Sequence, residues 1–172
     1  ELPVPAIGVV EPAANAAVKA TRNGRIGIIG TAATVRSGAF HKLMGKLDPS
    51  LHLFSQACPL FVPLVENGRY KPGDAVIETV AREYLEPLRR TGIDTLILGC
   101  THYPLLMDII GDILGDGVTL IDAGQQAAII CAEKLHEADA LNLTKRMGLR
   151  RFFVSDCPDD FSRVAAMFLG TE

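Results

Sequence analysis

The chain has 172 residues, with 17 basic and 20 acidic side chains and a formal net charge of −3. With 48% hydrophobic and 22% charged residues it has the composition of a globular protein with a sizeable core, without the basic stripe of a nucleic-acid-binding protein or the roughly 20 consecutive apolar residues that span a membrane. Its four cysteines are too few for a disulfide scaffold and form no C-x-x-C pair, so we expect a reducing, cytoplasmic setting.

Strand and helix patterns alternate along the chain. In chain order we predict a strand at Ala6–Val10, a helix at Pro12–Thr21, a strand at Arg25–Gly30, a helix that follows Gly30 and runs through His41 and Leu47, a strand at Leu51–Gln56, a helix at Gly73–Arg90, a strand at Ile93–Leu98, a helix at Leu105–Leu114, a strand at Val118–Ile121, a helix at Gln125–His136, a strand at Arg151–Ser155 and a helix at Asp159–Leu169. Repeated strand–helix units predict an α/β fold in which helices cover both faces of a parallel sheet. The polar, irregular stretch Ala138–Arg150 is the predicted boundary.

The segment Ile93–Pro104, with the sequence IDTLILGCTHYP, is the most informative part of the chain. Its apolar run predicts a buried strand, and Pro104 is tolerated in the first turn of a helix. We therefore expect Cys100 at the carboxyl end of a strand, where open α/β sheets bind ligands. The helix dipole and His102 are expected to lower the pKa of its thiol. Most cysteines in such places are inert packing, but three consecutive polar or reactive residues favour a site.

The segment Gly30–Gly38 follows a strand and opens a helix. Hydroxyl groups of Thr31 and Thr34, with nearby backbone N–H groups, could hold a carboxylate or a phosphate there. The simpler interpretation, in which Thr31 is only a helix N-cap, is favoured on this segment alone. The segment lacks the glycine and lysine pattern of nucleotide-binding loops, which argues against that function.

The segment Ala57–Gly68 follows another predicted strand and contains two further candidates. Cys58 is predicted to be packed rather than reactive. Glu66 precedes an Asn-Gly pair and is most simply a solvated turn residue. A chemical role for Glu66 would require it to fold back toward His102, which the spacing does not show.

Four segments together resemble a bacterial glutamate racemase, in order and at the right separations. They are GVVEP at Gly8–Pro12, Gly30–Gly38, ACPLFVPLVE at Ala57–Glu66 and LGCTHYPLL at Leu98–Leu106. The resemblance runs from about Ile7 to Gly170 and covers the C-terminal two-thirds of such an enzyme. On these motifs the chain is identified as a member of the aspartate/glutamate racemase superfamily.

The resemblance implies an α/β sandwich with a parallel sheet, of the Asp/Glu racemase type, and an active site between two domains. It also implies a two-base racemisation of L-glutamate to D-glutamate for peptidoglycan synthesis, with no cofactor and no metal. In this chemistry one cysteine removes the α-proton and a second cysteine protonates the opposite face. By the resemblance, Cys100 is one of these cysteines, His102 assists it and Glu66 lies near that histidine, while Thr101, Thr31 and Thr34 contact or lie near the substrate.

The chain departs from the family pattern at its beginning. The family carries an Asp-Ser-Gly segment and the first catalytic cysteine, in a Cys-Asn-Thr block, before the point where this chain starts, and Glu1 stands where an initiator Met would. We therefore expect that the missing N-terminal segment is required to complete the active site and that the 172-residue chain alone is inactive. By the same template, residues 11–122 form the complete second domain, and residues 1–10 and 123–172 belong to an incomplete first domain.

Other functions remain open at this stage. The chain could belong to a racemase for another acidic amino acid, such as aspartate, or be a carboxylate-binding fragment without catalysis. A metal site on Cys100 and His102 would need further ligands, for which Cys58, His52 and Glu66 are guesses. The expected partner is a small molecule, with neither nucleic acid nor membrane, and a homodimer is possible because apolar surface left by a missing domain promotes association.

Overall fold

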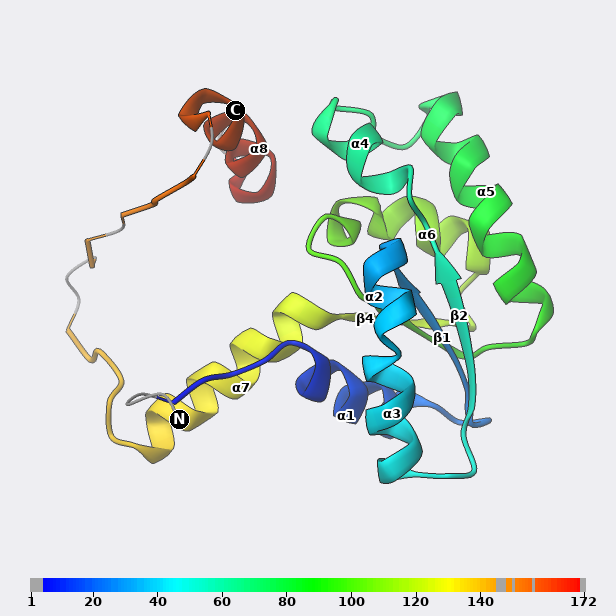
Figure 1. Ribbon diagram of the computed structural model, residues 1–172, viewed down its shortest axis with the longest axis horizontal. Helices are drawn as coiled ribbons and strands as arrows, with labels where there is room; N and C mark the ends of the chain where they lie inside the picture. Colours follow the sequence, from blue (N-terminus) through cyan, green and yellow to red (C-terminus); the bar gives the residue numbers. More distant parts are fainter. Residues whose placement is uncertain (1–4, 145–147, 150, 156, 171–172) are drawn as a thin grey trace.

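The computed structural model describes residues 5–144, 148–149, 151–155 and 157–170. Four parallel strands form one sheet in the order β2-β1-β3-β4 (Figure 1). The strands are β1 Arg25–Gly30, β2 His52–Ala57, β3 Thr95–Leu98 and β4 Thr119–Asp122. The helices are α1 Val10–Ala20, α2 Ala32–Ser37, α3 Ala39–Leu47, α4 Phe61–Glu66, α5 Ala75–Arg90, the 3₁₀ helix η1 Tyr103–Leu106, α6 Met107–Leu114, α7 Ala123–Glu137 and α8 Pro158–Leu169. The predicted α/β class with a parallel sheet is confirmed.

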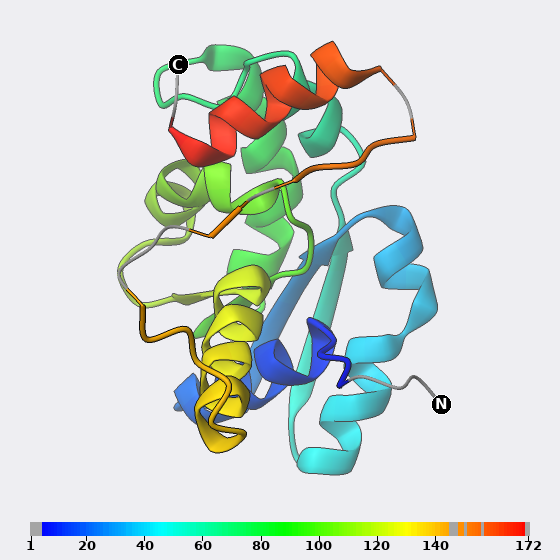
Figure 2. The ribbon, with the colours of Figure 1, turned by 90° about the vertical axis from the view of Figure 1, so that its left-hand side faces the viewer.

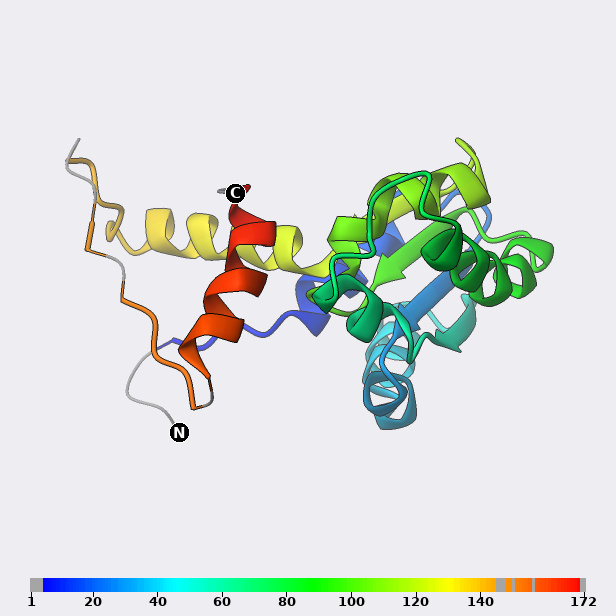
Figure 3. The ribbon, with the colours of Figure 1, turned by 90° about the horizontal axis from the view of Figure 1, so that it is seen from above.

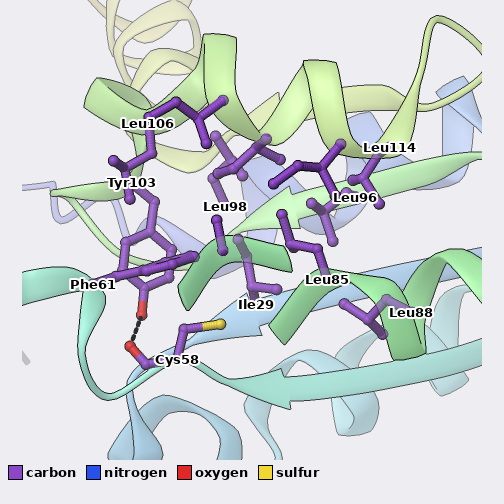
Figure 4. Packing of buried hydrophobic residues seen from close by; sticks show 14 of the residues in the cluster. Ile29, Cys58, Phe61, Leu85, Leu88, Leu96, Leu98, Tyr103, Leu106 and Leu114 are labelled. Atoms are coloured by element: carbon purple, nitrogen blue, oxygen red, sulfur yellow. Dashed lines mark hydrogen bonds between the residues drawn. The ribbon is translucent and has the colours of Figure 1, made fainter. Parts of the chain in front are cut away.

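Two apolar cores lie on opposite faces of this sheet, because successive side chains of a strand point to opposite faces. On one face, Ile26 and Ile28 of β1 pack against α1 and α3. On the other face, Ile29 packs with Leu96 and Leu98 of β3 against α4, α5 and α6 (Figure 4). Helices therefore cover both faces (Figure 3), as the repeated strand–helix units predict.

The strand register brings the carboxyl ends of the strands to one edge of the sheet. Gly30 at the end of β1 is aligned with Ala57 at the end of β2, and Leu98 at the end of β3 is aligned with Asp122 at the end of β4. Segments that follow these strands, far apart in the sequence, therefore meet at this edge. It is the edge at which α/β sheets bind ligands.

Two predicted helices are divided in the structure. The helix expected to follow Gly30 and run through His41 and Leu47 is broken at Gly38. This glycine has a φ of 61° and separates α2 from α3. This left-handed conformation is readily adopted by glycine and ends a helix. The helix expected at Leu105–Leu114 begins as η1 and becomes α-helical only at Met107.

Two predicted strands, Ala6–Val10 and Arg151–Ser155, are wrong. Residues 5–8 are irregular and Val10 already belongs to α1, while residues 151–154 are irregular and exposed. A strand is stabilised by hydrogen bonds to a neighbouring strand, and neither segment joins the four-stranded sheet. Of the predicted irregular stretch Ala138–Arg150, residues 138–144 and 148–149 contain no helix or strand, and residues 145–147 and 150 lie outside the described part of the chain.

The end of the chain extends away from the sheet. Helix α7 projects from the edge of the domain, and α8 lies beside the part of the domain that contains α4 (Figures 1 and 2). In α7 only the first residue, Ala123, is buried among the described residues, and Ile129 and Leu135 are exposed. None of the helices described is long and apolar enough to cross a membrane.

Asp94 anchors the opposite edge of the sheet, where β1 and β3 begin. Its carboxylate accepts hydrogen bonds from the Thr21 hydroxyl at 2.6 Å and from the backbone N–H groups of Arg22 and Asn23 at 2.6 and 2.7 Å. Asp94 is buried, with 6% of its surface exposed. Burial by itself raises the pKa of this carboxyl, but the hydrogen bonds outweigh burial and hold the pKa below its usual value.

We expect Asp94→Asn to destabilise the fold by about 2–3 kcal/mol, because an amide NH₂ would face backbone donors that now share a charged oxygen. Since the pKa of Asp94 is lower in the folded state, its contribution is fully present above the unfolded pKa of about 4 and is lost as pH falls through the folded value. Urea unfolding at pH 7 and at acidic pH checks this: the difference between wild type and variant shrinks in acid. Asp112→Asn, at an exposed position on α6, is the control and changes stability little at either pH.

Candidate active site

A tight turn at Gly99 presents the candidate side chains at the end of β3. The backbone N–H of Gly99 donates to the carbonyl of Ile29 at 2.8 Å, which continues the β1–β3 pairing by one residue. A Cβ atom at Gly99 would lie 2.7 Å from this same oxygen, a distance that carbon and oxygen do not tolerate without movement of a strand. Glycine is therefore required here, and Cys100 follows it directly.

Three side chains form a line of contacts away from this turn. The sulfur of Cys100 lies 4.0 Å from Nδ1 of His102, and Nε2 of His102 lies 3.1 Å from Oε1 of Glu66. Thr101 Oγ1 also approaches Nδ1, at 3.4 Å. The geometry thus places Glu66, 36 residues earlier in the chain, against the imidazole, at the last residue of α4 and not in a turn, although its side chain remains 44% exposed. An imidazole between a thiol and a carboxylate can pass a proton in either direction.

The expectation of a lowered pKa at Cys100 is wrong for this structure. Burial raises the pKa of the Cys100 thiol, and hydrogen bonds from the backbone N–H groups of His102 and Thr101 and from the Thr101 hydroxyl offset this only in part. The predicted helix dipole is weak at this point, because the next element is the four-residue 3₁₀ helix η1 and the α-helix begins at Met107. Burial thus favours the thiol form of Cys100 over its thiolate.

A cavity of about 330 Å³ opens beside Cys100. Cys100, Thr101 and Thr34 contribute its reactive and polar groups, and Phe40 contributes apolar wall. Its other lining residues are Val9, Val10, Ser37, Ala39, Gly99, Ala123 and Gly124. Val9, Val10, Ser37 and Gly99 lie in the segments that resemble a glutamate racemase, although no role in the site was assigned to them. Ala39, Ala123 and Gly124 lie outside those segments, and only the strand-end position of Ala123 and Gly124 pointed to them.

Thr31 is placed differently from Thr34. Its hydroxyl accepts from the Thr34 backbone N–H at 3.2 Å, which is the N-cap of α2, and it lies 3.0 Å from the Thr34 hydroxyl. The N-cap role of Thr31 is confirmed, and its predicted position near the substrate stays a prediction. Through this hydroxyl pair, Thr31 orients Thr34, which itself lines the cavity.

Cys58 packs in the core, as predicted. It is fully buried, its carbonyl accepts a hydrogen bond from the Tyr103 hydroxyl at 3.1 Å (Figure 4), and burial raises the pKa of its thiol to about 12. Such a thiol stays protonated and unreactive. Of the other candidate metal ligands, His52 is the first residue of β2, at the end of the strand opposite to Cys58. The described residues contain no group of three His, Cys, Asp or Glu side chains that could hold a metal ion.

Residues 1–131 match the family model described as Asp/Glu/Hydantoin racemase. The chain belongs to this family. Within it, the chain is 46% identical over 169 residues to the glutamate racemase of Geobacter metallireducens, covering 98% of this chain and 62% of that protein. It is 42% identical to the glutamate racemase of Listeria monocytogenes, covering 98% of this chain and 63% of that protein.

Solved racemase structures agree with this family membership. The glutamate racemase isoform RacE1 of Bacillus anthracis matches with a TM-score of 0.89 and 38% identity, covering 99% of this chain and 63% of that one. The glutamate racemase of Francisella tularensis in complex with D-glutamate matches with a TM-score of 0.88 and 36% identity, covering 99% and 62%. The chain thus spans less than two-thirds of the length of these relatives.

Proposed function

We propose that this chain provides one of the two acid/base groups in a cofactor-independent racemisation of L-glutamate to D-glutamate. The observation that carries the proposal is the line of contacts from Cys100 through His102 to Glu66, beside a cavity. A reactive thiol that faces a cavity and contacts a histidine oriented by a carboxylate is suited to proton transfer.

The geometry suggests how protons move. When Nε2–H of His102 donates a hydrogen bond to the Glu66 carboxylate, the Nδ1 lone pair faces the Cys100 thiol and can take its proton. This transfer leaves a thiolate and an imidazolium that is paired with the Glu66 carboxylate. The thiolate then removes the α-proton of the amino acid: an S–H bond forms as the Cα–H bond breaks, and the electron pair stays on the α-carbon. A second thiol delivers a proton to the opposite face. In the reverse direction the Cys100 thiol is the proton donor, the form that burial favours.

The size of the cavity is suited to a small substrate such as an amino acid. Its volume of about 330 Å³ is at the small end of the roughly 300–1,000 Å³ range of ligand pockets. In our proposal the hydroxyl groups of Thr101 and Thr34 donate to the substrate carboxylates. Glutamate is favoured over aspartate because the relatives of 42–46% identity are glutamate racemases.

We further propose that the second catalytic cysteine comes from a part of the full-length protein outside this chain, since the chain matches only 62% of the length of its relative from Geobacter metallireducens. In this arrangement residues 11–122 form one domain, and residues 1–10 and 123–172 complete another. The exposed apolar side chains of Ile129, Leu135 and Phe153 support this, because a packed partner would cover them. The D-glutamate would serve peptidoglycan synthesis in the cytoplasm, and a homodimer is compatible with the same exposed surface.

A racemisation assay with the full-length protein and the 172-residue chain tests the proposal. The loss of the circular dichroism signal is followed for L-glutamate, D-glutamate, L-aspartate and D-aspartate. We expect the full-length protein to racemise glutamate and the chain alone to be inactive. Faster turnover of aspartate would support the alternative substrate. Binding of glutamate without turnover by the full-length protein would show a carboxylate-binding protein and contradict the proposal.

Replacing Glu66 with glutamine is expected to lower kcat for glutamate by about 10- to 100-fold. This loss is smaller than the rate enhancement of about 10²–10⁴-fold that a positioned acid/base group contributes, because Glu66 acts through His102. Glutamine retains the shape and one acceptor oxygen but loses the charge that stabilises the imidazolium. The matched control is Glu83→Gln on α5, away from the cavity, which should leave kcat unchanged. Equal activities of Glu66→Gln and wild type would remove Glu66 from the proton path.

A further inference from the structure

Helix α8 contacts both members of the His102–Glu66 pair. The ring of Phe168 meets the ring of His102 edge to face, with centroids 5.6 Å apart and an interplanar angle of 81°. The contact joins residues 66 positions apart, and Figure 2 shows α8 crossing over the part of the molecule that contains α4. Such ring pairs have a preferred geometry and contribute beyond the apolar area that they bury.

A second residue of α8 contacts the end of α4. The carbonyl groups of Pro63, Leu64 and Val65 accept from backbone N–H groups that follow the helix. The next carbonyl, that of Glu66, accepts a hydrogen bond from the guanidinium of Arg163 instead. The last carbonyl groups of a helix have no partner within it, and a cation is favourable at that end. Arg163 thus caps α4 at the residue whose side chain holds His102.

We propose that Phe168 and Arg163 are positioning residues for proton transfer at Cys100: together they hold the Glu66 carboxylate and the His102 imidazole in line with the thiol. This inference rests on the proposed racemase function. Glu66 needs such support because it is the last residue of a six-residue helix and its side chain is 44% exposed. The ring of Phe168 fixes the plane of the imidazole, and Arg163 fixes the backbone from which the carboxylate extends.

The arrangement separates positioning from substrate binding. Among the described residues, those that line the cavity beside Cys100 come from the segment before α1, from α1, α2, α3, the Gly99–Thr101 turn and α7, with no contribution from α8. Loss of an α8 contact should therefore misplace the proton path without removing a substrate contact. In the full-length protein we expect Phe168→Ala to lower kcat about tenfold while KM changes less than about twofold. A misplacement of 1 Å can lower a rate about 100-fold, so a tenfold loss corresponds to a smaller displacement.

Deuterium isotope effects provide a readout that general destabilisation would not produce. Because the two enantiomers have equal free energy, kcat/KM must fall equally in both directions. When only the Cys100 half of the reaction is impaired, the effect of α-deuteration rises for the enantiomer that Cys100 deprotonates and falls for the other enantiomer. We expect this opposite change in Phe168→Ala and in Arg163→Met, which retains the length of the side chain but not its donors.

Leu169→Ala is the matched control, because Leu169 follows Phe168 on the same helix and is more exposed, at 59% against 41%. It should leave kcat and both isotope effects unchanged, and Phe168→Leu keeps apolar volume without the ring in case the alanine variant does not fold. Equal losses in the Leu169 and Phe168 variants, or isotope effects that stay symmetric, would overturn the positioning role. A wild-type full-length protein that does not racemise glutamate would instead overturn the proposed function.

Discussion

Replacement of Cys100 by serine should abolish racemisation of glutamate by the full-length protein, with kcat falling at least about 10³-fold. The serine hydroxyl is nearly isosteric but much less acidic than a thiol, whose ordinary pKa is about 8.5, so it cannot serve as an acid/base group near neutral pH. The half-buried position of Cys100 accepts serine without a change of shape, so the folded structure should persist. The measurement is the rate of optical change with each enantiomer, together with thermal unfolding.

Cys131→Ser is the control for this loss. Cys131 is an exposed cysteine on α7 and lies outside the cavity lining, so its replacement should leave the rate unchanged. A Cys100→Ser variant that retains more than a tenth of the wild-type rate would mean that another group performs the proton transfer on that face.

Gly99→Ala should both destabilise the protein and lower its activity. The added Cβ would lie 2.7 Å from the Ile29 carbonyl oxygen and 3.4 Å from the Phe40 ring, so the turn or β1 must move. Forcing a methyl group into such a packed site costs about 1–3 kcal/mol. The movement displaces Cys100, and a shift of about 1 Å at a reacting group lowers the rate about 100-fold. Urea unfolding and the racemisation rate of the full-length protein measure the two effects.

Gly45→Ala is the matched control for Gly99→Ala. Gly45 lies within α3, and a Cβ there meets no atom within 4 Å. Because alanine is the better helix former, this change should raise stability by about 0.5–1 kcal/mol and leave the rate unchanged. Wild-type stability and activity in Gly99→Ala would show that the turn tolerates movement and that Cys100 is not held by it.

The order of the elements and the local part of the site follow from the sequence because their causes are local. The β1 and β3 segments are short apolar runs flanked by helix patterns, which are sufficient to predict a parallel sheet. Cys100 and His102 are two residues apart, so a turn at the end of β3 brings them together whatever the rest of the chain does. The break between α2 and α3 was missed, although a glycine marks it, because glycine also occurs within helices.

The remaining features depend on tertiary packing. The contact between Glu66 and His102 arises because α4 packs beside η1 and α5, which the spacing of 36 residues does not encode. The raised pKa of Cys100 reflects burial by several elements. The contact of Arg163 with Glu66 spans 97 residues and has no sequence pattern. The segments predicted as strands at Ala6–Val10 and Arg151–Ser155 have strand composition but no neighbouring strand in this structure.

The most direct test of the central claim, that Cys100 exchanges the α-proton on one face of glutamate, is α-proton exchange followed by ¹H NMR in deuterium oxide. L- and D-glutamate are each incubated with the full-length protein and with its Cys100→Ser variant. We predict that wild type incorporates deuterium at the α-carbon of both enantiomers as they interconvert, and that Cys100→Ser loses exchange of the enantiomer that Cys100 deprotonates. Unchanged exchange of both enantiomers in Cys100→Ser would contradict the account.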